Sequence, residues 1–187
     1  EQSLRNTLFL RNVAKKDPRV AMLIFWAKQW LSTLRLKDSR HGLFSSYHIA
    51  VLVTHFLQGR IFNFSEEDMN GDLCPDTPIE KVLDHLISEE PKSPVVSQNL
   101  EPNITELILY FLDYYSKLDL HNIVISATEC LPRQRTEKET DEFLCLRDPF
   151  SPFTVCKVKR GADRFADAVS FTKKAMLVGK GLTWPIS

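Results

Sequence analysis

The fold is decided by one stretch in the first half of the chain, Gly42-Leu43-Phe44-Ser45-Ser46-Tyr47-His48-Ile49-Ala50-Val51-Leu52-Val53. A glycine turn leads into two serines, and an almost unbroken apolar run follows as far as Leu57. A serine hydroxyl accepts a free backbone N–H at the start of a helix, so this pattern predicts a helix over residues 46–57. Because the helix is apolar on nearly every face, we expect it to be buried in the centre of the fold.

Ser46 and Tyr47 would lie in the first turn of this helix, the end that attracts anions. A phenol beside hydroxyl and N–H groups can stack on a nucleobase and hold phosphate oxygens. The simpler interpretation is that Tyr47 is a half-buried aromatic residue and that the serines are only caps. His48 and His55 share one helix face, but no third ligand accompanies them, so we interpret them as hydrogen-bonded histidines of the core or its rim.

Two helices are predicted upstream of this stretch. Ser3–Ala14 carries leucines and a phenylalanine on one face and arginines on the other. Asp17-Pro18 is typical of a helix start, because the carboxylate caps the helix and proline fits its first position. This second helix is predicted to run to about Leu36, and it carries Lys28. Its apolar stripe has helical spacing and consists of Val20, Leu23, Ile24, Ala27, Leu31 and Leu34.

Two more helices begin at capping boxes further along the chain. Thr77-Pro78-Ile79-Glu80 predicts a helix that ends near Ser88, and Asn103-Ile104-Thr105-Glu106 predicts an aromatic-rich helix over 107–118. The acid- and proline-rich stretches between these helices are predicted to be irregular connections, residues 60–75 and 89–102.

The last third of the chain combines short strands with one helix. Ile123–Ile125 and Phe143–Leu146 are apolar runs that predict strands, and the charged stretch 132–141 between them is predicted to be a loop. A two-proline turn over 148–153 follows, and a helix is predicted over 162–178. The predicted fold class is therefore mainly α, a single domain over residues 1–187 with a small late β element.

Composition limits the possible classes of function. With 187 residues, 43% of them hydrophobic, the chain can bury one core. Its formal net charge of +0 leaves only local patches for binding nucleic acid. No apolar run reaches the roughly 20 residues that span a bilayer, so no membrane partner is expected. The 4 cysteines are widely spaced, which disfavours a zinc site or a disulfide scaffold and predicts free thiols in a reducing compartment.

The chain carries no self-contained catalytic motif. It has no G-x-S-x-G, H-E-x-x-H, Walker loop or G-x-G-x-x-G, and its carboxylates are dispersed without a D-x-D. We therefore predict no catalytic residue and no metal ligand within the chain. The sequence therefore favours a ligand-binding domain that works together with another part of a larger protein.

An ordered set of short motifs resembles a known family. The motifs are Leu4-Arg5-Asn6-Thr7-Leu8, Asp17-Pro18-Arg19-Val20 with Lys28-Gln29-Trp30, Leu43-Phe44-Ser45-Ser46-Tyr47 with Phe56-Leu57-Gln58, Glu106-Leu107-Ile108-Leu109-Tyr110-Phe111-Leu112-Asp113-Tyr114-Tyr115, and Asp148-Pro149-Phe150. Together they resemble the helical central and PAP-associated domain of noncanonical poly(A) polymerases and terminal uridylyltransferases, a branch of the DNA polymerase β-like nucleotidyltransferases. The resemblance covers nearly the whole chain and is closest to the cytoplasmic poly(A) polymerases.

The resemblance implies roles for four residues in nucleotide binding. Asn6 would contact the ribose hydroxyls, Lys28 would neutralise triphosphate charge, Ser46 would donate to a phosphate and Tyr47 would stack on the base. The alternatives are an ordinary polar helix residue for Asn6 and a lysine that snorkels from a core helix for Lys28. Many relatives carry a second lysine one turn later, where this chain has Ser32, so a weaker grip on the triphosphate is expected.

The base-side pocket is expected around the turn after the last strand, with Asp148, Phe153 and Thr154. Relatives that transfer uridylate carry a histidine shortly after the D-P-F motif, and residues 151–157 contain none. The resemblance therefore favours ATP over UTP. The alternative for Asp148 is a turn or cap carboxylate before Pro149.

The resemblance also implies two-metal phosphoryl transfer by a palm domain that is not in this chain. Three palm aspartates would hold Mg²⁺ (or Mn²⁺) and activate the RNA 3′-hydroxyl. The main hypothesis is the nucleotide-binding central domain of a template-independent RNA 3′-nucleotidyltransferase that adds ATP-derived nucleotides to RNA. The alternatives are a catalytically inactive scaffold, with docking surfaces at 64–76 and 89–102, and a terminal uridylyltransferase.

The expected partners are a nucleoside triphosphate, an RNA 3′ end and an RNA-binding partner protein, because the chain has no recognisable RNA-binding module and no net charge. The best local candidate for an RNA phosphate track is the basic group Lys157, Lys159, Arg160 and Arg164. The equally simple interpretation is a solvated charged face. The expected location is cytoplasmic, with the nucleus or ribonucleoprotein granules as alternatives.

Overall fold

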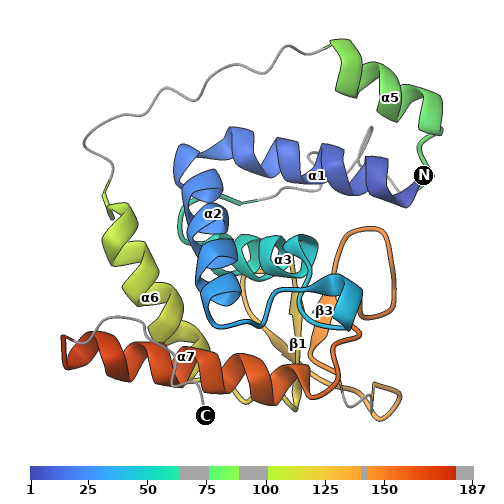
Figure 1. Cartoon of the computed structure of the whole chain (residues 1–187). Coiled ribbons are helices and arrows are strands. Elements are labelled where there is room, and N and C mark those ends of the chain that lie inside the picture. The colour runs from blue at the N-terminus through green and yellow to red at the C-terminus, as the bar shows by residue number, and fades with distance from the viewer. Residues whose placement is uncertain (64–75, 89–100, 140–142, 180–187) are drawn as a thin grey trace.

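The computed structural model describes residues 1–63, 76–88, 101–139 and 143–179, and it is mainly helical with a small late sheet (Figure 1). This confirms the predicted mainly α class with a small late β element. The elements in chain order are α1 (Gln2–Lys16), α2 (Pro18–Thr33), the 3₁₀ turn η1 (Ser39–His41), α3 (Ser46–Leu57), α5 (Ile79–Ser88), α6 (Ile104–Ser116), β1 (Ile123–Ser126), β2 (Arg133–Gln134), β3 (Cys145–Arg147) and α7 (Gly161–Leu177).

Helix α3 is the centre of the fold, as its sequence predicts. Every residue from Ile49 to Leu57 is buried. Helices α1 and α2 pack against α3, and so do α6, β1 and β3. Figure 1 shows α7 along the bottom of the molecule, α1 across its upper part, and α5 at the periphery above α1. The apolar run of α3 therefore contacts protein in almost every direction.

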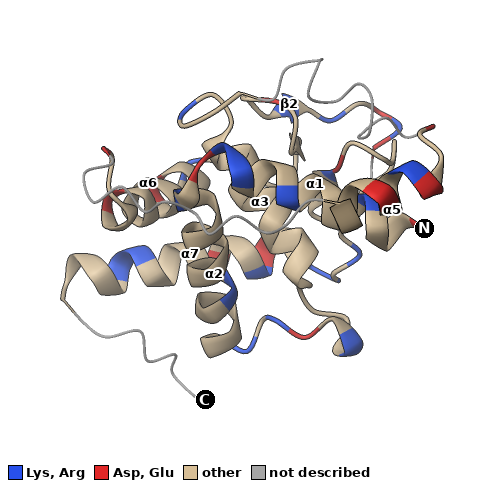
Figure 2. Ribbon diagram, turned by 90° about the horizontal axis from the view of Figure 1, so that it is seen from above, with Lys and Arg blue, Asp and Glu red and all other residues tan. Residues whose placement is uncertain are grey.

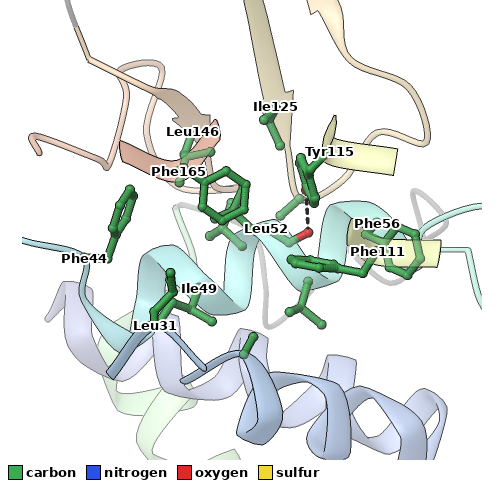
Figure 3. Close-up of a cluster of buried hydrophobic side chains, with 14 of the residues drawn as sticks. Leu31, Phe44, Ile49, Leu52, Phe56, Phe111, Tyr115, Ile125, Leu146 and Phe165 are labelled. Carbon is green, nitrogen blue, oxygen red and sulfur yellow. Dashed lines mark hydrogen bonds between the residues drawn. The ribbon is translucent and has the colours of Figure 1, made fainter. Parts of the chain in front are cut away.

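Aromatic side chains fill the space between α3 and its neighbours (Figure 3). The ring of Phe111 on α6 meets Phe56, Tyr115 and Phe165 edge-to-face, with centroid distances of 5.4, 4.9 and 6.5 Å. Tyr115 is buried, and its hydroxyl donates to the Leu52 carbonyl at 2.8 Å. Because that hydroxyl has a partner, a tyrosine can be accommodated in the apolar centre.

The predicted caps define where the helices begin. The Ser45 hydroxyl accepts from the His48 N–H at 3.1 Å, and the Ser45 N–H donates to His48 Nδ1 at 3.2 Å, so α3 starts with a reciprocal capping box. Asp17 accepts from the Arg19 N–H at 2.8 Å ahead of α2. Asn103 forms the same kind of box ahead of α6. Each of these starts was predicted from the sequence.

Helix α2 ends earlier than predicted. The prediction extended it to about Leu36, whereas the helix ends at Thr33. Arg35 has a left-handed backbone, with a φ of 56°, which turns the chain away from the helix axis. Leu34 remains buried, so the apolar stripe continues for one residue beyond the helix itself.

The sheet has three strands in the order β2-β1-β3. β1 pairs antiparallel with β2 and parallel with β3. β1 and β3 correspond to the two predicted strands, but the prediction of a loop over 132–141 was wrong at β2. Arg133 and Gln134 are both exposed, so β2 lacks the apolar alternation that would have marked a strand.

Both histidines of α3 are hydrogen-bonded, as predicted. His48 Nε2 donates to the Val155 carbonyl at 3.0 Å. His55 Nδ1 donates to the Ser126 carbonyl at 2.8 Å, and His55 Nε2 accepts from the Tyr114 hydroxyl at 2.8 Å. Burial lowers the pKa of both imidazoles, so the two rings stay neutral at physiological pH.

Candidate nucleotide-binding site

Tyr47 lies in the first turn of α3, where its hydroxyl donates to Asp148 Oδ2 at 2.9 Å. The ring is half-buried. Burial raises the pKa of the phenol, and the neighbouring Asp148 carboxylate raises it further, so Tyr47 remains a neutral hydrogen-bond donor. The ring is thus held at both ends, by the backbone of α3 and by the carboxylate of Asp148, 101 residues further along the chain.

Asp148 is buried and follows directly after β3. While its Oδ2 accepts from Tyr47, its Oδ1 accepts from the Phe150 N–H at 3.0 Å. Phe150 in turn meets Phe9 of α1 edge-to-face, with a centroid distance of 6.1 Å. A single carboxylate therefore links the start of α3 to the D-P-F turn, and that turn packs against α1. The turn-carboxylate alternative for Asp148 describes its contacts well, and those contacts also orient Tyr47.

The other predicted nucleotide contacts lie on helices that pack around Tyr47. Helices α1, α2 and α3 contact one another, and they carry Asn6, Lys28 and Ser46 respectively. The Asn6 amide oxygen accepts from Gln2 Nε2 at 2.9 Å. Lys28 and Ser46 are half-buried, and neither makes a hydrogen bond or ion pair through its side chain within the part of the chain that the structure describes.

The two other predicted base-side residues differ in their surroundings. Phe153 is 72% exposed, so its ring is accessible to a ligand. Thr154 is buried, and its hydroxyl accepts from the Leu146 N–H at 3.1 Å and donates to the Leu144 carbonyl at 3.1 Å. Thr154 therefore joins β3 to the segment after the turn, and it can shape the base side only by holding that segment in place.

We expect Thr154→Val to lower the free energy of unfolding by about 1–3 kcal/mol. Valine has the same shape, but it leaves the buried Leu146 and Cys156 N–H groups without the oxygen that accepts from both. Urea denaturation followed by circular dichroism measures this change. Thr105→Val, at an exposed position of α6, is the control and should change stability far less. Equal effects of the two substitutions would contradict this role of Thr154.

The predicted RNA track is partly occupied by contacts within the chain. Lys157 Nζ lies 5.3 Å from the centroid of the Phe143 ring, and Arg160 Nε donates to Asp163 Oδ2 at 3.0 Å. Lys159 and Arg164 are exposed. Figure 2 shows basic and acidic residues interspersed along the ribbon, in keeping with the formal net charge of +0. The track remains a prediction.

One concave feature was missed in the sequence analysis. A groove of about 310 Å³ lies beside the D-P-F turn and is lined by Val124, Ser126, Glu129, Arg133, Arg147, Ser151 and Pro152. The predicted strand ended at Leu146, and only its extension by one residue would have placed Arg147 on the face opposite Leu146. Without the position of β2, the sequence could not show that a second arginine would join it.

The remaining predictions concern docking stretches, metal ligands and membrane contact. The proposed docking stretches, 64–76 and 89–102, lie almost entirely outside the described residues. Within the described ranges, no group of three or more His, Cys, Asp or Glu side chains is placed to hold a metal ion. No helix in those ranges combines the length and the apolar character needed to cross a membrane.

Comparison with known proteins identifies relatives along most of the chain. Residues 103–153 match the family model described as Cid1 family poly A polymerase. The human poly(A) RNA polymerase GLD2 is 28% identical over 169 residues, which is 87% of this chain and 34% of the relative. GLD2-B of Xenopus laevis is 30% identical over 156 residues, 79% of this chain and 29% of the relative. The chain thus spans about a third of the length of the curated relatives it matches.

Solved structures share the fold. Terminal uridylyl transferase 4 from Trypanosoma brucei with bound GTP superposes with a TM-score of 0.66 and 16% identity, over 95% of this chain and 61% of that one. The GLD-2/RNP-8 complex gives a TM-score of 0.57 and 20% identity, over 91% of this chain and 51% of that one.

The family match and the relatives support the class of an RNA nucleotidyltransferase-like protein, and the solved structures share its helical fold. Residues 103–153 match the Cid1 family poly A polymerase model, and most of the chain is similar to poly(A) RNA polymerases of the GLD2 type.

Proposed function

We propose that this chain is the nucleotide-binding wall of a template-independent RNA 3′-nucleotidyltransferase that prefers ATP. The observation that carries the proposal is the hydrogen bond from Tyr47 to Asp148, which joins residues 101 positions apart and fixes an aromatic ring at the start of α3. An aromatic face that is held in place can stack on any base, and the helix start beside it favours phosphate. The match of residues 103–153 to the Cid1 family poly A polymerase model supports this interpretation of the geometry.

Each residue of the wall has a defined task in this proposal. Tyr47 stacks on the base, with its orientation set by Asp148. The Ser46 hydroxyl and the positive end of α3 receive phosphate oxygens, and Lys28 neutralises part of the triphosphate charge. Asn6 contacts the ribose hydroxyls. Phe153, exposed on the turn after β3, closes the base side, where uridylate-transferring relatives carry a histidine. The absence of a histidine from residues 151–157 supports a preference for ATP over UTP.

The phosphoryl transfer itself belongs to another domain. The described residues offer no carboxylate cluster that fits Mg²⁺ or Mn²⁺, so we derive no step through a metal held by this chain. When bound by a palm domain, such ions would activate the RNA 3′-hydroxyl and stabilise the leaving pyrophosphate. This chain's part is to bind and orient the nucleotide.

The proposal includes a protein partner that brings RNA to the enzyme. One structural relative was solved as a GLD-2/RNP-8 complex, which supports the idea that a second protein assists this fold. The zero net charge of the chain agrees with an external source of RNA affinity. We also propose a cytoplasmic location.

Tyr47→Ala is expected to lower kcat/KM for ATP by about 10- to 100-fold, because stacking of a base on an aromatic side chain contributes roughly 1–3 kcal/mol. Tyr47→Phe keeps the ring but loses the bond to Asp148 that orients it, so its activity should fall between those of wild type and Tyr47→Ala. The measurement is extension of a short labelled RNA with each nucleoside triphosphate in turn, by the longer protein that carries this chain together with a palm domain.

Tyr110→Ala is the control, because this tyrosine is 54% exposed on α6. Extension with UTP instead of ATP would refute the base preference and leave the class of enzyme intact. Full activity of Tyr47→Ala would refute the role of the ring. A folded protein that extends RNA with no nucleotide would support the scaffold alternative.

A further inference from the structure

The groove beside the D-P-F turn is the outer face of the three-stranded sheet. Val124 of β1 pairs with Arg133 of β2, and Ser126 of β1 pairs with Arg147 of β3. The alternate residue Ile125 points the other way, into the hydrophobic core (Figure 3). The floor of the groove therefore presents two guanidinium groups, a hydroxyl and one apolar side chain on a single face.

Arg133 and Arg147 share one carboxylate. Arg133 donates to both oxygens of Glu139, at 2.8 and 2.6 Å, and Arg147 Nη2 donates to Glu139 Oε1 at 2.5 Å. Two positive charges thus surround one negative charge at this end of the groove, and the carboxylate of Glu129 lies elsewhere on its wall. Arg147 Nε is buried, and it has no hydrogen-bond partner among the residues that the structure describes. Within the described residues Arg147 donates to Glu139 through Nη2 alone, and its side chain is 17% exposed, so the outer part of the guanidinium group can meet a ligand.

We propose that this groove binds one nucleotide of the single-stranded RNA substrate, upstream of the reacting 3′ end. Arginine forks match phosphate oxygens, so the phosphate lies against Arg147 and Arg133. Pro152, which is exposed, offers an apolar surface for the base. The carboxylate of Glu129 accepts from a ribose hydroxyl. A groove of about 310 Å³ has the size of a single nucleotide, and as a surface groove it lets a chain enter and leave.

The position of the groove connects it to the nucleotide-binding wall. Ser151 and Pro152 line the groove and come directly after Phe150, whose N–H donates to the same carboxylate that holds Tyr47. The D-P-F turn therefore separates the two sites by the thickness of one loop. RNA that leaves the reaction site can cross this turn and reach the sheet face. This part of the inference rests on the proposed function, whereas RNA binding by the groove itself does not.

The test measures RNA binding by the 187-residue chain, without nucleotide or metal, using fluorescence anisotropy of a labelled 15-nucleotide oligoadenylate. Arg147→Gln should weaken binding by about five- to tenfold, because a charge-assisted contact to phosphate is lost. The RNA affinity of Arg147→Lys should lie between those of wild type and Arg147→Gln, because lysine keeps the positive charge but cannot make the two-pronged contact of a guanidinium group. DNA of the same sequence should bind more weakly than RNA, because it lacks the 2′-hydroxyl.

Two further variants control for folding and for general charge. Ser151 Oγ accepts from the Phe153 N–H at 3.2 Å, and an aspartate can do the same, so Ser151→Asp adds a negative charge to the groove while keeping the turn. It should weaken RNA binding about as much as Arg147→Gln. Lys174→Gln removes one positive charge from an exposed position of α7 and should change binding less than twofold. Circular dichroism checks that every variant is folded.

Three outcomes would overturn the proposal. The first is that the wild-type chain binds no RNA at low salt. The second is equal binding of DNA and RNA. The third is that Arg147→Gln and Ser151→Asp bind RNA as well as wild type does, whereas Lys159→Gln and Arg164→Gln bind it weakly. That result would place the RNA on the basic track predicted from the sequence. A chain that binds RNA through Arg147 but belongs to a protein that extends no RNA would refute the proposed function alone.

Discussion

Phe111→Ala is expected to lower the free energy of unfolding by about 3–5 kcal/mol, the largest change predicted for any single substitution here. Phe111 is buried and its ring contacts aromatic side chains from α2, α3 and α7, including Trp30 at a centroid distance of 6.3 Å. Alanine removes the ring and leaves a cavity that four helices cannot all move to fill. Since domains of this size are stable by roughly 5–15 kcal/mol, the variant would be close to unfolding.

Urea denaturation followed by tryptophan fluorescence measures this loss, because Trp30 and Trp26 both lie against Phe111. Tyr110→Ala is the matched control, since it removes an aromatic ring from the adjacent position of α6 where the side chain is 54% exposed. It should change stability by less than about 0.5 kcal/mol. Similar losses for the two variants would show that α6 contributes through its helix alone and not through the packing of Phe111.

The second large effect is expected for Glu139→Gln, which should lower the free energy of unfolding by about 2 kcal/mol near neutral pH, less than for a fully buried pair because the Arg133 side chain is 43% exposed. The Glu139 side chain is 12% exposed and is the shared acceptor for Arg133 and Arg147. A neutral amide leaves these two guanidinium groups facing each other without a counter-charge. Hydrogen bonds from Arg133 and from the Thr136 N–H, with a further one from Arg147, hold the pKa of the Glu139 carboxyl well below its ordinary value of 4.5.

The sign of the pH dependence follows from this depressed pKa. In acid the unfolded chain binds a proton at Glu139 more readily than the folded chain does, so folding is penalised as pH falls. The stabilisation by Glu139 is therefore complete above about pH 4.5 and declines below it towards the folded-state pKa. Urea denaturation between pH 7 and pH 3 should show the difference between wild type and Glu139→Gln shrinking with acid. Glu137→Gln, at an exposed position two residues away, should leave the pH profile unchanged. A constant difference at every pH would contradict this account.

Glu139 also connects stability to the proposed RNA groove. It orients the arginines that would meet an RNA phosphate, so Glu139→Gln should disturb RNA binding as well as folding. Arg147→Gln leaves the two-pronged bond between Arg133 and Glu139 in place, which makes it the cleaner probe of binding.

The sequence by itself determined the class of fold, most helix starts and the family resemblance. These features depend on patterns within a few residues. The patterns are the apolar run of α3, the capping residues Ser45 and Asp17, and short motifs in a fixed order. Such patterns act locally, because a cap or an apolar stripe stabilises the helix that contains it. They therefore remain visible in a sequence with no structure attached.

Only the tertiary structure decided which distant side chains meet. The bond between Tyr47 and Asp148 joins two motifs that the sequence placed separately, and Arg133 reaches Arg147 only because the exposed pair Arg133–Gln134 forms a strand. The early end of α2 and the buried hydroxyl of Thr154 were likewise set by packing. These outcomes depend on long-range pairing, whose free energy comes from burial and hydrogen bonds between segments far apart in the chain, and no local pattern records it.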